Sequence, residues 1–311
     1  MYQRMLVPLD GSEVAEVAVT YAKELVARLD LEEVIILHVS NPSMEGFLPM
    51  RLAYVEQTAE TIRREARKIR SNLTAPADTR LAKVRGELVV GYPADEILRY
   101  ADEHKIDLIL IARHGRSGIR RWTLGSVSAK IMSASKLPVL LVPACLPGET
   151  PYDEWPTKTV IVPLDGSELA ETALPHAEAV AKQLDTEPLN MTLLRIFEPP
   201  TTPTYYGPDL AEVPLNWGQY VQEETERGEK AAKEYLATVE NRLKEKRLNI
   251  RSEVIIGKAS DIIVDYANKN PHSIIVMTTH GRSGLSRWVY GSVAQNVIRA
   301  VCCPVLVIKP D

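Results

Sequence analysis

Short apolar runs alternate with longer segments of helical periodicity along the whole chain. The runs are rich in Val, Ile and Leu, and the segments between them place their apolar residues on one helical face. This alternation predicts βαβ units on a parallel sheet. The expected strands lie near Arg4–Leu9, Val34–Val39, Ala82–Val89, Leu108–Ala112 and Val139–Val142, and near Thr159–Leu164, Met191–Ile196, Arg251–Ile256, Ser273–Met277 and Val305–Ile308.

Five strands in each half, joined by crossovers long enough for helices, predict two doubly wound (Rossmann-like) α/β domains, each with a five-stranded parallel sheet. Ser12 stands where a helix N-cap is expected, and apolar residues follow it on one face from Val14 to Val26. The run Glu223–Lys246 places opposite charges at helical spacing and predicts one long solvated helix.

Two segments of the first half recur in the second half. VPLDGSE at Val7–Glu13 is repeated unchanged at Val162–Glu168, 155 residues later (162 − 7). HGRSGIRRWTLGSV, from His114, matches HGRSGLSRWVYGSV, from His280, at ten of fourteen positions and an offset of 166 (280 − 114). The two domains are therefore homologous repeats. The offset grows by 11 residues (166 − 155), and we assign this insertion to the Pro-rich run Glu198–Pro214.

The repeats set the domain boundaries. We expect domain 1 at residues 1–144 and domain 2 at residues 158–311. Residues 145–157 combine Pro, Gly and acidic residues without apolar periodicity, which is typical of a linker.

Composition narrows the class of protein. The 311 residues are 45% hydrophobic and 25% charged, as in ordinary soluble globular proteins. With 37 Lys and Arg against 41 Asp and Glu, the formal charge of −4 provides no basic field for nucleic acid. No stretch approaches the ~18 apolar residues of a membrane span, and the first residues lack the apolar core of a signal peptide. Three cysteines without metal-ligand spacing fit a reducing compartment, so we expect a cytoplasmic protein.

The candidate chemistry lies where strands end. In a doubly wound sheet the ligand crevice lies beyond the carboxyl ends of the strands, where the strand order reverses. Asp10 follows the first expected strand, and Gly11 and Ser12 lead into a helix. The carboxylate of Asp10 is thus placed at the crevice. An Asp-Gly pair is equally what a plain strand-to-helix turn requires, and the sequence leaves both roles open.

A glycine-rich segment follows the fourth expected strand. Gly115 and Gly118 open a loop, and nine residues separate Gly115 from Gly125, where Ser126 begins an apolar helical stretch. Glycines that admit a close backbone approach, followed by a helix N-terminus, suit a phosphate chain. The second repeat has Gly281, Gly284, Gly291 and Ser292 at the same intervals. Arg116 and Arg282, next to the loop glycines, are candidate phosphate contacts, whereas the other loop arginines are better explained as a solvated rim.

Taken together, these motifs in this order resemble the universal stress protein family, here with two domains in tandem. The resemblance covers nearly the whole chain. It implies a sheet of strand order 3-2-1-4-5, ATP bound through a pattern G-x2-G-x9-G-[S/T], and pairing of domains through the last strand. It also implies that Asp10 and Asp165 serve the adenosine end, that Val39 and Ile196 line the adenine pocket, and that the glycine loops hold the phosphates.

The resulting candidate sites have the same design in both repeats. The first site comprises Pro8, Leu9, Asp10, Val39, Ala112, Gly115, Arg116, Gly118, Gly125, Ser126 and Val127, and the second comprises Pro163, Leu164, Asp165, Ile196, Thr278, Gly281, Arg282, Gly284, Gly291, Ser292 and Val293. The first glycine of the family pattern is replaced by Ala112 in one repeat and by Thr278 in the other. Because threonine is the larger of the two, we expect the first site to bind more tightly.

The leading functional hypothesis is a cytoplasmic stress-response protein that binds ATP, AMP or ADP, with Mg²⁺ accompanying the nucleotide, and acts as a sensor or regulator rather than a catalyst. We expect the two repeats to form an intramolecular pseudo-dimer, with room left for a homodimer, and no nucleic-acid or membrane partner. Two alternatives remain open. One is a slow ATP-hydrolysing or adenylyl-transferring enzyme, for which Asp10 or Asp165 would be the recurrent magnesium ligand. The other is a nucleotide-free scaffold, which Thr278 makes most plausible for domain 2.

Overall fold

A computed structural model provides the structure of the protein. It describes residues 2–72, 81–113, 124–143, 159–183, 190–200, 216–244, 248–270, 272–279 and 291–310. The expected linker at residues 145–157 and most of the Pro-rich run Glu198–Pro214 lie outside these ranges.

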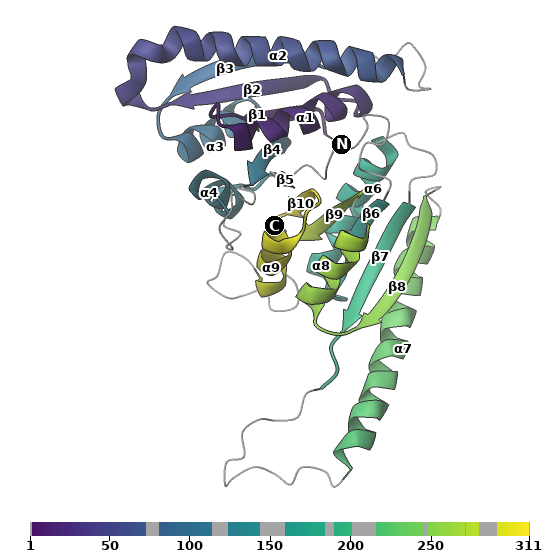
Figure 1. The fold of residues 1–311 in the computed structure, drawn as a ribbon. Helices are drawn as coiled ribbons and strands as arrows, with labels where there is room; N and C mark the ends of the chain where they lie inside the picture. Colours follow the sequence, from purple (N-terminus) through teal and green to yellow (C-terminus); the bar gives the residue numbers. More distant parts are fainter. Residues whose placement is uncertain are drawn as a thin grey trace, which may run out of the picture.

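The described part of the chain forms one ten-stranded sheet with helices on both faces (Figure 1). The strands are β1 (Arg4–Pro8), β2 (Glu33–Ser40), β3 (Lys83–Val90), β4 (Leu108–Arg113), β5 (Val139–Pro143), β6 (Thr159–Pro163), β7 (Asn190–Phe197), β8 (Asn249–Ile256), β9 (Ser273–Thr278) and β10 (Val305–Ile308). The α-helices are α1 (Glu13–Arg28), α2 (Leu48–Ser71), α3 (Pro93–Glu103), α4 (Ser126–Ala134), α5 (Glu168–Glu171), α6 (Ala173–Gln183), α7 (Trp217–Lys244), α8 (Ala259–Lys269) and α9 (Ser292–Ala300).

The strand order is β3-β2-β1-β4-β5-β10-β9-β6-β7-β8. Each repeat therefore has the order 3-2-1-4-5, and within each repeat the neighbouring strands pair parallel. These findings confirm the doubly wound fold that the sequence predicts. The strand order reverses between β1 and β4 in the first repeat and between β6 and β9 in the second, which is where such folds bind ligands.

Alternation along the strands separates the core into two layers. Met5 and Val7 of β1 point to the layer that α1, α2, α6 and α7 cover, whereas Leu6 points to the layer under α3, α4, α8 and α9. All three side chains are fully buried. Both layers continue through the two repeats, so the ten strands share one apolar core on each face.

The two repeats meet edge to edge. β5 and β10 pair antiparallel, with Leu140 opposite Leu306, and together they join the two five-stranded halves. Side chains also cross this junction, since Lys309 Nζ donates a hydrogen bond to the Ser133 carbonyl oxygen at 3.0 Å. The Tyr2 hydroxyl lies 2.7 Å from Nδ1 of His176. Pairing β5 with β10 leaves neither apolar strand as an open sheet edge.

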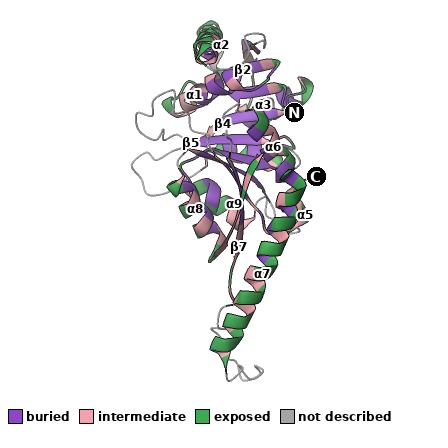
Figure 2. Ribbon diagram, turned by 90° about the vertical axis from the view of Figure 1, so that its right-hand side faces the viewer, coloured by how far each residue is buried: buried purple, intermediate pink, exposed green. Residues whose placement is uncertain are grey.

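Helix α7 extends well beyond the sheet (Figures 1 and 2). Its buried residues, Ala232, Leu236, Val239 and Leu243, all lie in its second half, and the first half is largely exposed. The predicted long helix is thus confirmed, but its second half is only partly solvated, and it begins at Trp217, before the charged run that indicated it. None of the helices in the described ranges is both long and apolar enough to cross a membrane.

Candidate functional site

A cavity of about 230 Å³ opens where β1 and β4 diverge in the first repeat. It is lined by eight of the predicted site residues, Pro8, Leu9, Asp10, Val39, Ala112, Gly125, Ser126 and Val127. Positions more than 100 residues apart are brought together because β1, β2 and β4 end, and α4 begins, on the side of the sheet where the carboxyl ends of the strands lie. The sequence motifs thus converge on one cavity.

Asp10 is held by the turn that starts α1. The Ser12 N–H donates to Asp10 Oδ1 at 2.9 Å, and the Ser12 hydroxyl oxygen accepts from the Ala15 N–H at 3.2 Å as the N-cap. Gly11 between them has a φ of +81°, which favours glycine. Asp10 therefore has the structural role that a turn requires, while its exposed carboxylate lies at the cavity.

Helix α4 presents its N-terminus to the same cavity. Its N-cap is Gly125, in extended conformation, and no side chain in the described ranges caps it. The Ser128 hydroxyl and the Ala129 N–H both donate to the Gly125 carbonyl oxygen, at 3.0 and 2.8 Å. The first N–H groups of a helix have no intrahelical acceptor and carry a partial positive charge, so Ser126 and Val127 can bind an anion here.

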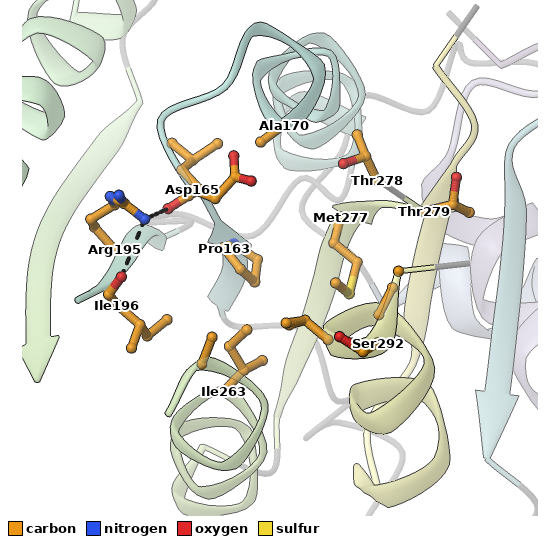
Figure 3. A pocket seen from close by; sticks show the side chains of 15 residues that line it. Pro163, Asp165, Ala170, Arg195, Ile196, Ile263, Met277, Thr278, Thr279 and Ser292 are labelled. Atoms are coloured by element: carbon orange, nitrogen blue, oxygen red, sulfur yellow. Dashed lines mark hydrogen bonds between the residues drawn. The ribbon is translucent and has the colours of Figure 1, made fainter. Parts of the chain in front are cut away.

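The second repeat has a cavity of about 250 Å³ at the equivalent place (Figure 3). Its lining includes the predicted residues Pro163, Leu164, Asp165, Ile196, Thr278, Gly291, Ser292 and Val293. The turn is the same: the Ser167 N–H donates to Asp165 Oδ1 at 2.9 Å, and Gly166 has a φ of +81°. Gly291 caps α9 without a side-chain bond from the described residues.

Two features distinguish the second cavity from the first. Thr278 lines it where Ala112 lines the other, and its side chain is 7% exposed. Arg195 also lines it, with one guanidinium nitrogen 3.4 Å from the Leu164 carbonyl oxygen and 3.2 Å from that of Ile196. Figure 3 shows these two contacts as dashed lines.

The Gly291 N–H donates to the Thr279 carbonyl oxygen at 2.8 Å, and a Cβ at Gly291 would lie 3.3 Å from that oxygen. The start of α9 is thus packed closely against the end of β9.

In the first repeat His38 takes the place of Arg195. The His38 ring is 2% exposed, its Nδ1 lies 2.9 Å from the Leu9 carbonyl oxygen, and its Nε2 lies 2.5 Å from the Arg51 guanidinium. Burial lowers the pKa of His38, as does the Arg51 charge, against the opposing effects of Leu9 and Asp10. His38 is therefore neutral around pH 7 and accepts at Nε2 the hydrogen bond that Arg51 donates.

A tyrosine–glutamate pair joins the long helix to the first helix behind each cavity. The Tyr54 hydroxyl donates to Glu16 in the first repeat, and the Tyr235 hydroxyl donates to Glu171 at 2.9 Å in the second. Burial and the neighbouring glutamate raise the pKa of both tyrosines. Both hydroxyls therefore stay protonated, and their hydrogen bonds join α2 to α1 and α7 to α5.

Some predicted site residues lie outside the described ranges. These are the loop glycines and arginines Gly115, Arg116, Gly118, Gly281, Arg282 and Gly284. Their role in phosphate binding stays a prediction.

Several lining residues were not found from the sequence. In the first cavity they include Pro93 and Ile97 of α3, and in the second Ala259 and Ile263 of α8. These pairs hold equivalent positions, because both are 166 apart (259 − 93 and 263 − 97). One helical turn between two apolar residues at a helix start is their only sequence signal, and core packing produces the same signal.

Known proteins resemble both halves of the chain. A model described as the universal stress protein family matches residues 1–143 and again residues 156–309. Universal stress protein MJ0577 of Methanocaldococcus jannaschii is 31% identical over 158 residues, covering 46% of this chain and 95% of that protein. Universal stress protein Rv2005c of Mycobacterium tuberculosis is 24% identical over 311 residues, covering 98% and 96%. The crystal structure of a universal stress protein from Archaeoglobus fulgidus superposes with a TM-score of 0.66 at 19% identity, covering 98% of both chains, and this likeness concerns the fold.

Proposed function

The chain belongs to the universal stress protein family, as a tandem member with one family match in each half, and on that basis we propose that it binds an adenine nucleotide in the cavity of each repeat. We propose further that it serves as a stress-response sensor or regulator in the cytoplasm. The observation that carries the proposal is the pairing, in each cavity, of a turn carboxylate with a glycine-capped helix N-terminus.

The residues present fit an adenine nucleotide. The glycine caps leave room for a phosphate oxygen at the N–H groups of Ser126 and Val127, and of Ser292 and Val293. We assign Asp10 and Asp165 to the adenosine end and Val39 and Ile196 to the base, and the support is that all four residues line the cavities. Cavities of about 230 and 250 Å³ lie just below the usual range for small-molecule sites and suit a single ligand each. ATP is the ligand we propose, with AMP and ADP as the alternatives.

Mg²⁺ would accompany the nucleotide by neutralising charge on its phosphates. Among the cavity-lining residues in the described ranges, the carboxylates are Asp10 in the first repeat and Asp165 in the second. Because these carboxylates are assigned to the adenosine end of the nucleotide, Mg²⁺ would be held mainly by the phosphates and by water.

We propose a binding role rather than a catalytic one. General acid–base catalysis of phosphoryl transfer needs a group that positions the nucleophile beside the phosphates. The described lining of the first cavity offers Asp10, and Asp10 Oδ1 already accepts the hydrogen bond that fixes its own turn. The same holds for Asp165 and the Ser167 N–H.

We further propose that the halves act as domains, at residues 1–144 and 158–311 with a linker at 145–157, and that they form an intramolecular pseudo-dimer. The support is the antiparallel pairing of β5 with β10 and the apolar core that continues across it.

Isothermal titration of the full chain with ATP and Mg²⁺ tests the proposal, and two binding events are expected. Gly125→Val should abolish the event of the first cavity, because a branched side chain at the helix cap hinders the close approach of the phosphates to the backbone. Gly291→Val is the matched variant for the second cavity. Circular dichroism checks that both variants fold. Unchanged ATP affinity in both folded variants would contradict the proposed sites.

Incubation of the protein with ATP and Mg²⁺ for hours, followed by measurement of the remaining ATP and the released phosphate, separates the remaining functions. Unchanged ATP after hours supports a binding protein, since typical enzymes turn over at ~1–10³ per second. Phosphate or adenylyl transfer at such rates would establish an enzyme instead. Absence of any binding would leave a nucleotide-free scaffold.

A further inference from the structure

Arg113 is a buried charge that lies between the two repeats. It is the last residue of β4 in the first repeat and is 3% exposed. Its guanidinium donates to the carbonyl oxygens of Ile298 and Val301, at the C-terminal end of α9 in the second repeat. The contact thus joins a strand of one domain to a helix of the other.

The chemistry of the contact is well matched. The last carbonyl groups of a helix have no intrahelical donor and carry the negative end of the helix dipole. A buried guanidinium in turn requires acceptors, and hydrogen bonds from a charged donor are stronger than neutral ones. Each side therefore satisfies a group that would be costly to leave unpaired, and the end of α9 is fixed against β4.

Both partners reach a candidate nucleotide cavity. Ala112, the residue before Arg113, lines the first cavity. The opposite end of α9, with Gly291, Ser292 and Val293, lines the second. Since α9 has only nine residues and packs against the sheet through Ala294, Val297 and Ile298, a shift at its C-terminal end is transmitted to its N-terminal end. A continuous chain of bonded residues thus runs from one cavity to the other.

The equivalent junction between the second repeat and helix α4 of the first repeat is built differently. The residue equivalent to Arg113 in the second repeat is Thr279 (113 + 166), which has no guanidinium to reach α4. Near the end of α4, Lys309 donates a single hydrogen bond to the Ser133 carbonyl oxygen, but Lys309 follows β10 rather than β9, and β10 lines neither cavity. Within the described ranges, the path through Arg113 therefore has no symmetric counterpart.

We propose that Arg113 is a positioning residue for the second cavity, and that it makes the nucleotide affinity of the second cavity depend on whether the first cavity is filled. This inference rests on the proposed function, because it requires nucleotide at both cavities. A ligand in the first cavity fixes the end of β4 at Ala112, which fixes Arg113 and, through it, α9. Coupling between two sites is typically about 5- to 150-fold in affinity, so we expect at least about fivefold here.

Isothermal titration with ATP and Mg²⁺ measures this coupling. In the wild type, the second cavity fills when the first is occupied, whereas in Gly125→Val it fills with the first blocked. The ratio of these two affinities measures the coupling. It should be at least about fivefold when Arg113 is present. It should fall below about twofold when Arg113→Met is introduced into both the wild type and Gly125→Val. Arg113→Lys, which keeps the charge and one donor, should recover part of it. Arg299→Met is the matched control, because Arg299 lies on the exposed face of the same helix.

Hydrogen exchange provides a second test that leaves Arg113 unchanged. In Asp165→Ala, which takes nucleotide at the first cavity and leaves the residues of α9 unchanged, ATP should slow exchange of the Val301 amide, whose N–H donates to the Val297 carbonyl oxygen. Unchanged exchange across α9 overturns the inference even if the Arg113 variants do not fold.

The outcomes separate the two levels of the argument. A wild type that takes no ATP ends the proposed function and this inference together. ATP binding at both cavities with the same ratio in wild type and Arg113→Met ends the inference alone. A ratio that falls equally in Arg299→Met points to general weakening of α9 and also overturns it.

Discussion

His38 of β2 and Arg195 of β7 occupy the same position in the two repeats, and each bonds the carbonyl oxygen of the leucine that follows the first strand. Pro8 pairs with Leu37 and Pro163 with Leu194, which makes the next residues, His38 and Arg195, equivalent. Nδ1 of His38 lies 2.9 Å from the Leu9 oxygen, and the Arg195 guanidinium lies 3.4 Å from the Leu164 oxygen. The same contact is thus made by a group that can lose its charge in one repeat and by a permanent charge in the other.

The stability of the protein should fall in mild acid because of His38. Burial and Arg51 lower the pKa of His38 below 6.5, so the unfolded chain takes up the proton first and the free energy of unfolding falls as the pH drops below that value. His176, whose pKa burial also lowers, adds to the effect in the same direction. The loss is at most about 1.4 kcal/mol per pH unit for each histidine. Urea unfolding between about pH 7.5 and about pH 5 should give a flatter profile for His38→Gln than for the wild type. Parallel profiles would contradict this assignment.

Gly86 of β3 has no room for a side chain. A Cβ there would lie 2.5 Å from the Val55 carbonyl carbon and 2.6 Å from the Glu56 nitrogen of α2, both backbone atoms. Gly86→Ala must therefore displace α2 and should lower the free energy of unfolding by about 1–3 kcal/mol, measured by urea unfolding. Gly46→Ala is the control, since nothing lies within 4 Å of a Cβ there. Equal effects of the two substitutions would show that the close approach of α2 is not what limits position 86.

The two cavities should bind ATP unequally. Thr278 brings a larger side chain to the cavity lining than Ala112 does, and crowding of the ligand by such a side chain costs about 1–3 kcal/mol, or about 5- to 150-fold in affinity. In isothermal titrations, Asp10→Ala should remove the stronger event and Asp165→Ala the weaker one. Thr278→Ala should tighten the second cavity, while Ala112→Thr weakens the first. Loss of the stronger event in Asp165→Ala would reverse the order and point to Arg195 as a source of affinity.

Cleavage of the linker should leave the two halves associated. Limited proteolysis near Pro151 cuts the chain, but the β5–β10 pairing, the bond of Lys309 to Ser133 and the shared core remain. The nicked protein should elute from gel filtration in native buffer at the volume of the intact chain, and denaturant should separate the fragments. Elution as separate halves without denaturant would contradict the pseudo-dimer.

The sequence predicts the fold because its signals are local. Most strands are apolar runs, and the observed bounds differ from the expected ones by a residue or two, as for β8, which begins at Asn249 rather than Arg251. Helix α7 begins at Trp217, before the charged run, and Asn216 stands at the position before it; this capping residue is a signal in the sequence that the charge pattern alone does not use.

The sequence predicts the cavities only in part. Asp10 and Gly125 are found because turns and helix caps use few residue types. Arg195 was missed because a charged residue within a strand reads as solvent-facing until the neighbouring carbonyl group is located. Arg113 was missed for a stronger reason: its acceptors lie 185 and 188 positions along the chain, and only the antiparallel junction brings them together.

The strand order also decides which edges of the sheet face other molecules. With β5 and β10 covering each other, the open edges are β3 and β8, at opposite ends of the ten strands. Pairing of β3 of one copy with β8 of another would make a head-to-tail contact, and such a contact propagates as a fibre when its rotation does not close a ring. Both edges carry adjacent ion pairs on one face, Arg85 with Glu87 and Arg251 with Glu253 at 2.8 Å. Another chain docking on either strand would have to strip water from these charges. The molecule is therefore protected from aggregation at the two places where its sheet is open.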